Sequence, residues 1–487
     1  MELLIGGFYR FNSLPLSSQE CCNLYPNIPE QVTPSKKQLF IPSGIRTVTT
    51  AGSSYSRGSH TFLNKPYFVQ GTGLYRIDQT IDGFGNASYS STLVSGATLL
   101  PGTEQVIMAD NGQEGSQMMI VCPALNTQFN AFVYDGATLT AVSDMDFDGP
   151  VSDVNYIDGY FEFTKKDGQK FFISALRDGT AYDALDFGSA EASPDYNVRS
   201  IVLRNQLYVA GAITLEPFQN VPQGAAFPFQ YIQGGVQGKG FASIYAVEVV
   251  NDVMYFLGAG ENEVPSIWIT NGGGFEKIAT VPIDQEITHY SLETLSNCFT
   301  WNYSDAGGQF VAFTFPGERC FVFDIKSKEW HTRESQNSMG QTVPCRISNI
   351  TQAYGLLFVG DSLTNKIGVF DHDIYTEFDD YVYRRFVLPQ IDNDGQPFFN
   401  PTLEVVGCAG IGLTSGQGSD PLISLSISRD GGRTYNNPTP RHVGKIGDYK
   451  RRCIWNQLGQ VQREFCAKFE MSDPVPWAIT KVEANFD

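Results

Sequence analysis

Two short stretches of the chain carry residue types that could bind a cation. Residues 392–395 (Asp-Asn-Asp-Gly) are similar to the opening of a calcium-binding loop, and residues 371–373 (Asp-His-Asp) place two carboxylates beside an imidazole. A calcium loop also needs a glutamate at its twelfth position, and the nearest one, Glu404, comes one residue too late. No two of the five histidines stand at metal-ligand spacing. Both stretches are therefore predicted to be polar turns, and we expect no metal or other cofactor.

A third polar stretch, residues 428–435, has the pattern Ser-x-Asp-x-Gly-x-Thr-aromatic, known as an Asp-box. The aspartate of such a turn accepts backbone N–H groups across a hairpin, the glycines supply positive φ, and the aromatic ring packs underneath. Asp-boxes recur in sialidase propellers, where they are structural and not catalytic. We predict a structural turn made by Ser428, Asp430, Gly432, Thr434 and Tyr435.

Other motifs with a known chemistry are missing from the sequence. There is no G-x-x-x-x-G-K-[ST], H-E-x-x-H or G-x-S-x-G, and Gly71-Thr72-Gly73 lacks the third glycine of a dinucleotide-binding fingerprint. The nine cysteines are scattered and never at C-x-x-C spacing, which predicts reduced, mostly buried thiols in a protein folded in the cytosol. We therefore predict no catalytic residues and no enzymatic activity.

The charge of the chain is distributed unevenly. Its formal net charge is −19, so most of its surface should repel nucleic acid. Residues 429–487 nevertheless hold ten Lys and Arg against seven Asp and Glu. The densest basic cluster comprises Arg441, Lys445, Lys450, Arg451 and Arg452. We predict that this cluster is a docking surface for another subunit; a solvated strand face and a phosphate contact are the alternatives.

Strands joined by tight turns must position these residues. Of the 487 residues, 42% are hydrophobic and 13% aromatic, which excludes a largely disordered chain, and 48 are glycines. Apolar and polar residues alternate in strand-pair units that recur every ~40–60 residues, and helical periodicity is nearly absent. This pattern predicts an all-β chain with a β-propeller-like body of six or seven degenerate blades.

The composition also divides the chain into parts. Residues 1–45 are rich in proline, serine and asparagine and are predicted to form an extended N-terminal arm. Residues 46–380 should form the propeller-like body, with a long ordered loop near 215–240, and residues 381–487 a β-rich C-terminal docking region. The start lacks the basic and apolar regions of a signal peptide, and no stretch reaches the roughly 18 apolar residues of a membrane span, so membrane insertion is not expected.

Several motifs, taken in order, resemble the packaged-DNA stabilisation family of short-tailed bacteriophages, the tail-hub or nozzle proteins. Near the start these are N-L-Y-P at residues 23–26 and L-F-I-P-S-G-I at residues 39–45; in the middle they are F-T-F-P at 313–316, W-H-T-R at 330–333 and V-G-D at 359–361. Towards the end they are S-D-P at 419–421, the Asp-box, G-K-I-G-D-Y at 444–449 and S-D-P-V at 472–475. The chain departs from the family pattern at Ser43, Tyr435 and Gln457.

The resemblance implies a virion protein of a phage tail, synthesised in the host cytoplasm. It would form a homo-oligomeric ring, hexameric in the family, below the portal and the adaptor or head-completion protein. This ring would retain the packaged double-stranded DNA, provide its exit channel without binding it specifically, and carry a tail needle, fibres or spikes. The family has no catalytic residues.

Two other functions remain open from the residues alone. A sialidase-like hydrolase would need a cluster of arginines and two carboxylates converging in one central pocket, and spatial pairing of acids is not visible in a sequence. A non-catalytic glycan-binding or receptor-binding propeller is the other alternative.

Overall fold

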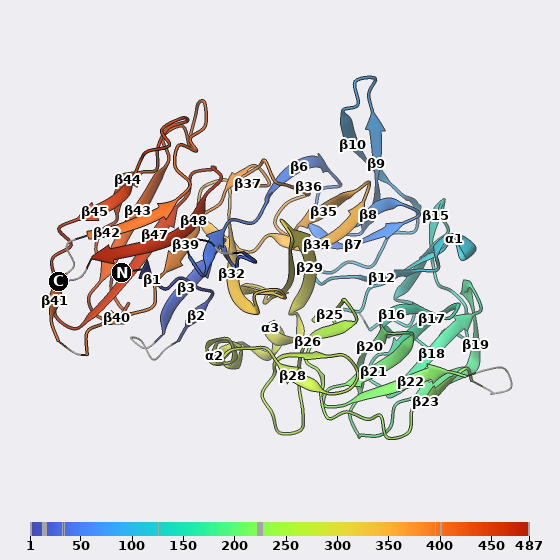
Figure 1. The fold of residues 1–487 in the computed structure, drawn as a ribbon. Helices are drawn as coiled ribbons and strands as arrows, with labels where there is room; N and C mark the ends of the chain where they lie inside the picture. The colour runs from blue at the N-terminus through green and yellow to red at the C-terminus, as the bar shows by residue number, and fades with distance from the viewer. Residues whose placement is uncertain are drawn as a thin grey trace.

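The computed structural model describes residues 2–11, 17–31, 33, 35–124, 126–221, 227–394, 396–399 and 402–485. Strands dominate it and form two modules, a β-propeller and a β-sandwich that contains both ends of the chain (Figure 1). Three short helices complete the described part: α1 (Gly112–Gly115), α2 (Val281–His289) and α3 (Leu292–Ser296). None of these described helices has the length and apolar character needed to cross a bilayer.

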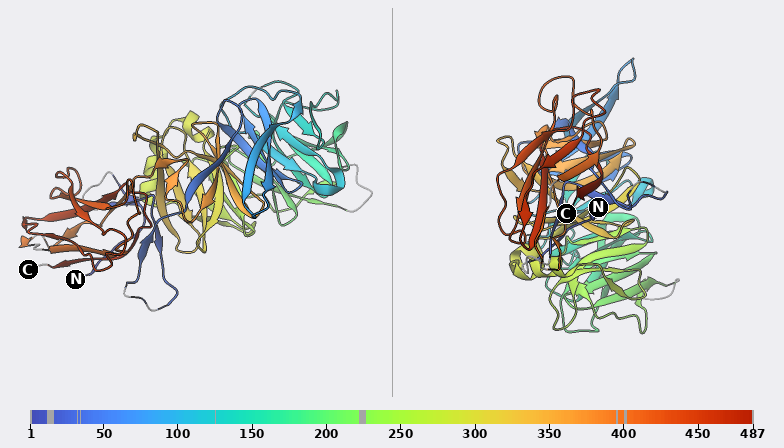
Figure 2. Two further views of the ribbon diagram at one scale, coloured as in Figure 1. Left: turned by 90° about the horizontal axis from the view of Figure 1, so that it is seen from above. Right: turned by 60° about the vertical axis from the view of Figure 1, so that its left-hand side comes forward.

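The propeller consists of seven sheets in the described part of the chain (Figure 2). The first three contain β7 (Ser56–Phe62), β8 (Lys65–Gln70), β9 (Gly73–Ile81) and β10 (Ala87–Leu93); β11 (Ser95–Gly96), β12 (Ile107–Asp110), β13 (Met118–Val121), β14 (Ala131–Tyr134) and β15 (Thr138–Ala141); and β16 (Val151–Ile157), β17 (Tyr160–Lys165), β18 (Lys170–Ala175) and β19 (Asp178–Ser189).

The next three sheets continue in chain order. They contain β20 (Asn197–Leu203), β21 (Gln206–Gly211), β22 (Leu215–Asn220) and β23 (Phe229–Tyr231); β24 (Gly240–Phe241), β25 (Val247–Val250), β26 (Val253–Ala259), β27 (Ser266–Thr270) and β28 (Phe275–Lys277); and β29 (Phe299–Asp305), β30 (Gly308–Thr314), β31 (Cys320–Asp324), β32 (Glu329–Gln336) and β33 (Thr342–Pro344).

The seventh sheet closes the ring with a strand from the start of the chain. It contains β34 (Ile347–Ala353), β35 (Leu356–Asp361), β36 (Lys366–Asp371), β6 (Gly44–Thr50), β37 (Thr376–Glu377) and β38 (Asp380–Tyr381). Strand β6 pairs antiparallel with β36, and β34 packs beside β7 of the first sheet. The prediction of an all-β propeller with six or seven blades and a β-rich C-terminal domain is confirmed.

The recurring turn of the propeller explains the repeat visible in the sequence. In most blades the first and second strands are joined by two residues that both have positive φ, as at Arg204–Asn205 (50° and 59°) and Asn251–Asp252 (51° and 59°). Such turns match the right-handed twist of the strands they join, and asparagine, aspartate and glycine adopt them most readily. The degenerate repeat is thus mainly a repeat of turn residues and of alternating apolar positions.

Part of the stretch 215–240, where the sequence predicts a long loop, forms strands β22 and β23 instead, while residues 222–226 lie outside the described residues. Phe218 and Phe229 are buried in the fourth blade, and the Phe218 ring lies 4.8 Å, centroid to centroid, from Phe171 of the third. This aromatic packing outweighs the proline and glutamine composition that predicts a loop.

The sandwich combines C-terminal strands with strands from residues 2–40. One sheet contains β4 (Tyr25–Asn27), β5 (Gln38–Phe40), β48 (Ala478–Asn485), β42 (Thr402–Gly407), β45 (Cys453–Asn456) and β1 (Glu2–Leu3). The other contains β3 (Ser18–Cys22), β39 (Arg384–Val387), β47 (Glu464–Met471), β43 (Leu422–Ser428), β44 (Thr439–His442), β40 (Ile391–Asp392) and β2 (Tyr9–Arg10); β41 (Phe398–Phe399) pairs with β46 (Gln460–Val461). Buried Trp455, Phe469 and Trp477 belong to the core shared by these strands.

Strand β3 joins the two modules into one continuous sheet. On one side Cys22 pairs with Thr332 of β32, the outer strand of the sixth blade, and on the other residues 20–22 pair antiparallel with β39 of the sandwich. On the propeller side this pairing is one residue long, and the Asn23 N–H adds a hydrogen bond to the Thr332 carbonyl at 2.9 Å, so bending between the modules would break these contacts. The modules are therefore held as one body.

Candidate functional site

The Asp-box residues form a tight hydrogen-bonded turn directly after β43. The Asp430 carboxylate accepts N–H groups from Arg433 and Thr434 (3.0 and 2.9 Å) and hydroxyl groups from Ser428 and Thr434 (2.6 Å each). The Ser428 hydroxyl in turn accepts the Gly432 N–H at 2.8 Å, and Gly432 has a φ of 87°. These bonds hold the pKa of Asp430 below its ordinary value. The turn lies in the sandwich, away from the propeller centre, and its bonds are internal.

Replacing Asp430 by alanine should destabilise the sandwich by about 1–3 kcal/mol, because several hydrogen-bond donors lose their acceptor. The lowered pKa means that the carboxylate stabilises the fold fully above the unfolded value of about 3.9, and that this contribution decreases as pH falls from there through the lower pKa of the folded state. Thermal unfolding at pH 7 and pH 3 checks both points. The difference from wild type should shrink at pH 3, and alanine at the exposed Asp448 of the same domain should change little.

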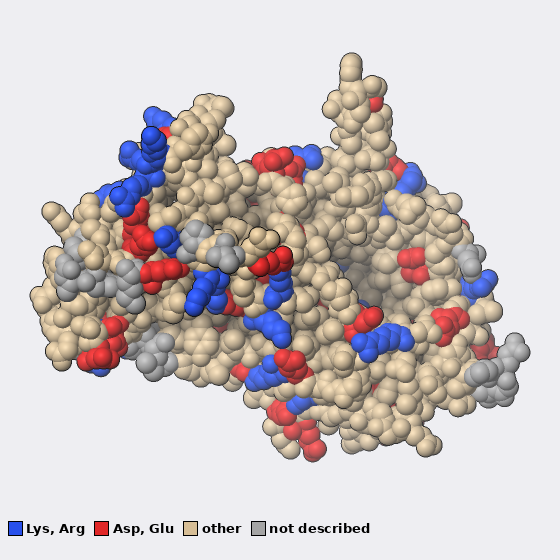
Figure 3. Space-filling view, in the orientation of Figure 1, with Lys and Arg blue, Asp and Glu red and all other residues tan. Residues whose placement is uncertain are grey.

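The predicted basic cluster lies along β44 and the loop that leads to β45. Figure 3 shows Lys and Arg side chains gathered over this end of the sandwich. Arg441 donates to the Ile454 carbonyl at 3.0 Å, and Arg452 donates to both carboxylate oxygens of Glu404 at 2.8 and 2.5 Å. Lys450 and Arg451 are exposed.

The loop itself is held by backbone hydrogen bonds. The N–H of Asp448 donates to the carbonyl of Lys445 at 2.9 Å, and that of Gly447 to Gly410 at 3.3 Å. The Lys445 ammonium lies 3.8 Å from Asp420. The structure thus brings the five basic residues together on one surface, where Arg441 and Arg452 also brace the sandwich and the others face solvent.

The two candidate cation sites are occupied by internal contacts. The Asp371 carboxylate accepts the Arg46 Nε–H at 2.8 Å and the Asp373 N–H at 3.0 Å. Asp392 accepts the N–H of Asp394 at 2.8 Å within an exposed turn, and Gly395 lies outside the described residues. Over the described ranges, no group of three or more His, Cys, Asp or Glu side chains is placed to hold a metal ion.

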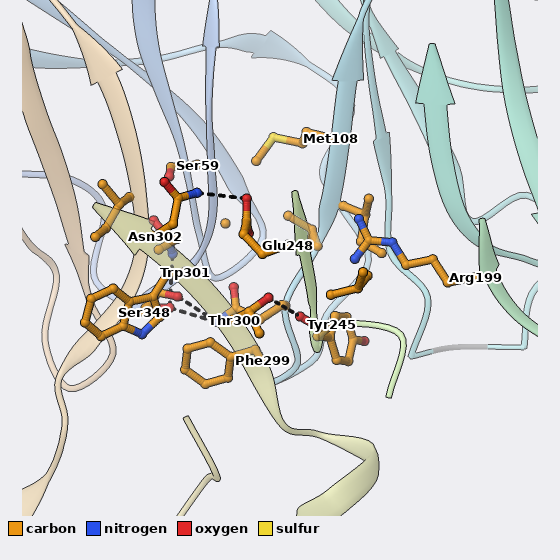
Figure 4. A pocket seen from close by; sticks show the side chains of 17 residues that line it. Ser59, Met108, Arg199, Tyr245, Glu248, Phe299, Thr300, Trp301, Asn302 and Ser348 are labelled. Carbon is orange, nitrogen blue, oxygen red and sulfur yellow. Dashed lines mark hydrogen bonds between the residues drawn. The ribbon is translucent and has the colours of Figure 1, made fainter. Parts of the chain in front are cut away.

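A cavity of about 300 Å³ lies at the centre of the propeller (Figure 4). Among its described lining residues, Arg199 is the one arginine and Glu248 the one carboxylate. The Asn302 side chain donates to Glu248 at 2.9 Å, and Arg199 donates to the Ile244 carbonyl at 2.7 Å. Burial raises the pKa of Glu248 to about 7. The arginine cluster and carboxylate pair that a sialidase-like hydrolase would need are not assembled among these residues.

Next to this cavity, Asp153 and Glu162 form a fully buried acidic pair. The Ser200 hydroxyl lies 3.2 Å from Asp153 and 2.5 Å from Glu162, and the Ser200 N–H donates to Asp153 at 2.9 Å. Arg199 lies 3.7 Å from Asp153. Burial and the neighbouring Asp153 charge raise the pKa of Glu162 strongly, and burial also raises that of Asp153.

Glutamine at position 162 should stabilise the propeller at neutral and higher pH. A buried acid with a raised pKa opposes folding once the unfolded chain can ionise, so the contribution of Glu162 to stability falls as pH rises above about 4.3. Glu162→Gln removes this dependence while keeping a donor and an acceptor in place. Its Tm should exceed that of wild type by a few degrees at pH 8 and by less at pH 4.5. Glu276→Gln, on an exposed strand, is the control; an equal effect from both variants would contradict the assignment.

The junction between the modules holds charged and polar residues that the sequence analysis did not single out. Glu20 of β3 is buried and receives hydrogen bonds from Arg10 and, at 2.7 Å, from Arg385, which also lies 3.3 Å from Glu334. These contacts lower the pKa of Glu20 against the opposing effect of burial. Glu20 links β3 to the sandwich strand β39 through Arg385, and Arg385 links β39 to β32.

Asn23, directly after β3, makes the densest set of junction hydrogen bonds. Its side-chain N–H groups donate to the carbonyls of Glu334 (2.8 Å) and Tyr383 (2.7 Å), and its side-chain oxygen accepts the Glu334 N–H at 3.2 Å. Its own N–H donates to Thr332 at 2.9 Å. The motifs N-L-Y-P and W-H-T-R, distant in sequence, therefore meet here. The sequence contained one signal for this junction: a glutamate, Glu20, lies within the short buried strand β3, and an asparagine, Asn23, follows that strand directly.

Comparisons with known proteins agree with this two-module architecture. Residues 1–375 match the family model described as "Bacteriophage P22 Gp10, beta-propeller", and residues 383–487 match "Bacteriophage P22 Gp10, beta-sandwich". The tail hub protein gp10 of Salmonella phage P22 is 23% identical over 383 residues, covering 74% of this chain and 77% of that protein.

Solved structures resemble the chain only loosely. The PorZ protein of Porphyromonas gingivalis matches 67% of this chain and 38% of that chain at 11% identity, with a TM-score of 0.38. U3-55K matches 67% of this chain and 99% of that chain at 9% identity, with a TM-score of 0.37. The family models cover nearly the whole chain and confirm the resemblance read from its motifs: the protein belongs to the bacteriophage P22 Gp10 family.

Proposed function

We propose that the chain is a structural subunit of a phage tail hub that assembles into a closed, hexameric ring below the portal and adaptor. The ring retains packaged DNA, forms its exit channel and carries distal parts such as a needle, fibres or spikes. The chain is made in the host cytoplasm and functions in the virion without membrane insertion. Family membership supports the tail-hub role, since the related protein of phage P22 is a tail hub protein.

One observation supports the structural role most strongly: strand β3 joins the propeller and the sandwich into one sheet. A subunit of a ring that retains packaged DNA must transmit mechanical force between the surfaces that attach it to its neighbours. A continuous sheet braced by Glu20 and Arg385 suits that task, because neither module can swing without breaking strand pairing.

The charge of the chain supports a channel that DNA traverses without specific binding. A subunit with net charge −19 repels the phosphate backbone, and several copies around a pore repel it more strongly. The basic cluster then serves as a docking surface for the adaptor or a neighbouring subunit. We propose no enzymatic activity for the chain, in line with the single arginine and single carboxylate among the described residues of the central cavity.

Charge reversal tests the docking assignment. Arg451→Glu with Arg452→Glu should reduce incorporation of the chain into tails at least tenfold, whereas Arg204→Glu with Lys328→Glu, at exposed propeller positions, should leave it near wild type. Counting the chain in purified particles by quantitative mass spectrometry gives the answer. Unchanged incorporation of the first variant would refute the docking role, and hydrolysis of sialosides or oligosaccharides by the purified chain would refute the non-enzymatic one.

A further inference from the structure

The β9–β10 hairpin packs at its base against the seventh blade, where Tyr89 contacts Phe358, but its tip protrudes beyond these contacts. It stands clear of the propeller in Figure 1 and in the space-filling view of Figure 3. At its tip Phe84 is 93% exposed, the highest value among the large hydrophobic side chains that the structure describes. Gly83 and Gly85 flank it and have open space where a side chain would begin, so the ring projects alone. Covering an exposed phenyl ring with a partner surface is favourable, because it removes apolar area from water.

The tip is preorganised. The Asp82 carboxylate accepts the N–H groups of Phe84 and Asn86, both at 2.8 Å, and the Asn86 side-chain amide at 2.9 Å. The backbone N–H of Asp82 donates to the Asn86 carbonyl at 3.0 Å, which closes the turn. A ring held in place before binding loses little conformational entropy when it is buried, which is the property of an anchor residue.

The sandwich has a cavity of matching size and charge. Its volume is about 270 Å³, and its walls include Val405, Ile423, Val443 and Trp477. A space of about 150 Å³ already holds benzene, so this larger space, which apolar and charged residues line together, has room for a phenyl ring. Lys450 and Arg451 belong to the same lining, together with the ion pair of Arg452 and Glu404, so the described lining carries a net positive charge. Residues 79–93 of the hairpin carry a single charge, the carboxylate of Asp82 next to the ring, which complements them.

We infer that Phe84 of one copy of this chain inserts into the sandwich cavity of the next copy. The hairpin belongs to the propeller and the cavity to the other module; in Figures 1 and 2 the hairpin lies away from the sandwich strands β42 and β45, whose residues line the cavity. In Figure 3 the basic end of the sandwich and the hairpin stand out from the same side of the molecule. A contact between two different surfaces of identical chains repeats from copy to copy and closes into a ring when the rotation allows.

A cysteine in the cavity allows this contact to be tested by disulfide cross-linking. Cys408 lines it and is exposed, whereas the other eight cysteines are buried. A thiol introduced by Phe84→Cys would lie beside Cys408 of the neighbouring copy. A mild thiol oxidant such as diamide, which takes up two electrons and two protons, would then join the two sulfurs as a disulfide.

The experiment uses full-length chain in assembled tails and rests on the proposed tail-hub function. After oxidation of Phe84→Cys tails, we expect a ladder of covalent multimers of this chain on a non-reducing gel. Adding Cys408→Ser should abolish the ladder, and cysteine at Leu292 or Met339, which are 84% and 82% exposed, should not produce it. Tails that contain the chain but give no ladder, or give a disulfide to a different tail protein, would overturn the inference while the proposed function stands. Absence of the chain from tails would instead overturn both.

A second measurement does not depend on the introduced thiol. Because Phe84 is exposed in the single chain, Phe84→Ser should leave the Tm unchanged while reducing incorporation into tails at least tenfold. Phe84→Leu, which keeps an apolar side chain, should be incorporated into tails almost as well as wild type. Equal incorporation of wild type and Phe84→Ser would contradict the anchor role.

Discussion

Replacing Arg346 by methionine should destabilise the protein by about 3–5 kcal/mol, the largest effect we expect from a single substitution. The guanidinium is buried; it donates to both oxygens of Asp361 (3.1 and 2.6 Å) and to Asp380 at 2.5 Å, and its centre lies 5.1 Å from the centroid of the Phe378 ring. Methionine fills similar volume but leaves two carboxylates without their cation. Thermal unfolding followed by tryptophan fluorescence measures the loss.

A matched surface pair provides the control. Arg452 makes the same two-pronged contact with Glu404, yet its side chain is 67% exposed. Exposed ion pairs contribute about 0–1 kcal/mol, so Arg452→Met should change stability little. Similar losses from both variants would show that burial does not set the contribution of Arg346. Arg346→Lys should fall between the two, because one ammonium cannot form the planar fork that contacts two carboxylates.

Replacing Asn23 by alanine should cost about 2–4 kcal/mol and loosen the junction between the modules. The change removes three side-chain hydrogen bonds and leaves backbone groups of Glu334 and Tyr383 without those partners. It also places alanine at a φ of 54°, where asparagine is better tolerated. We expect a lower Tm and faster proteolytic separation of propeller from sandwich.

Asn64 supplies the control for backbone strain. It has a φ of 62° in an exposed turn of the first blade, so Asn64→Ala should cost only about 1–2 kcal/mol and leave the junction resistant to protease. Asn23→Gly separates the two causes at the junction itself, since glycine accepts the φ but makes no side-chain bonds. If Asn23→Gly behaved like wild type, the side-chain bonds would not be what holds the modules together.

Local patterns were sufficient to predict the propeller because each blade is made by local rules. Alternating apolar residues define its strands, and turn residues such as Asn251 and Asp252 define its hairpins. The sequence could not decide between six and seven blades because the repeats are degenerate. The closing strand β6 also comes from the other end of the propeller sequence, and such a pairing leaves no local signal.

The junction could not be predicted for the same reason. Cys22 pairs with Thr332 and Arg385, residues that lie hundreds of positions away in the chain. Composition made residues 1–45 look like an arm, although their strands complete the sandwich and bridge to the propeller. Glu20 and Arg346 are charged residues in buried positions, and only the folded chain shows which partners make that burial possible. The basic cluster, in contrast, could be predicted because its charged residues lie close together in the sequence.

Electron microscopy of the purified virus particle tests the central claim most directly. A passive structural role predicts a closed ring of this chain in the tail below the portal, with propeller and sandwich in the relative arrangement fixed by β3. Absence of the chain from the mature particle would contradict it, as would a particle in which the two modules adopt unrelated orientations from one copy to the next.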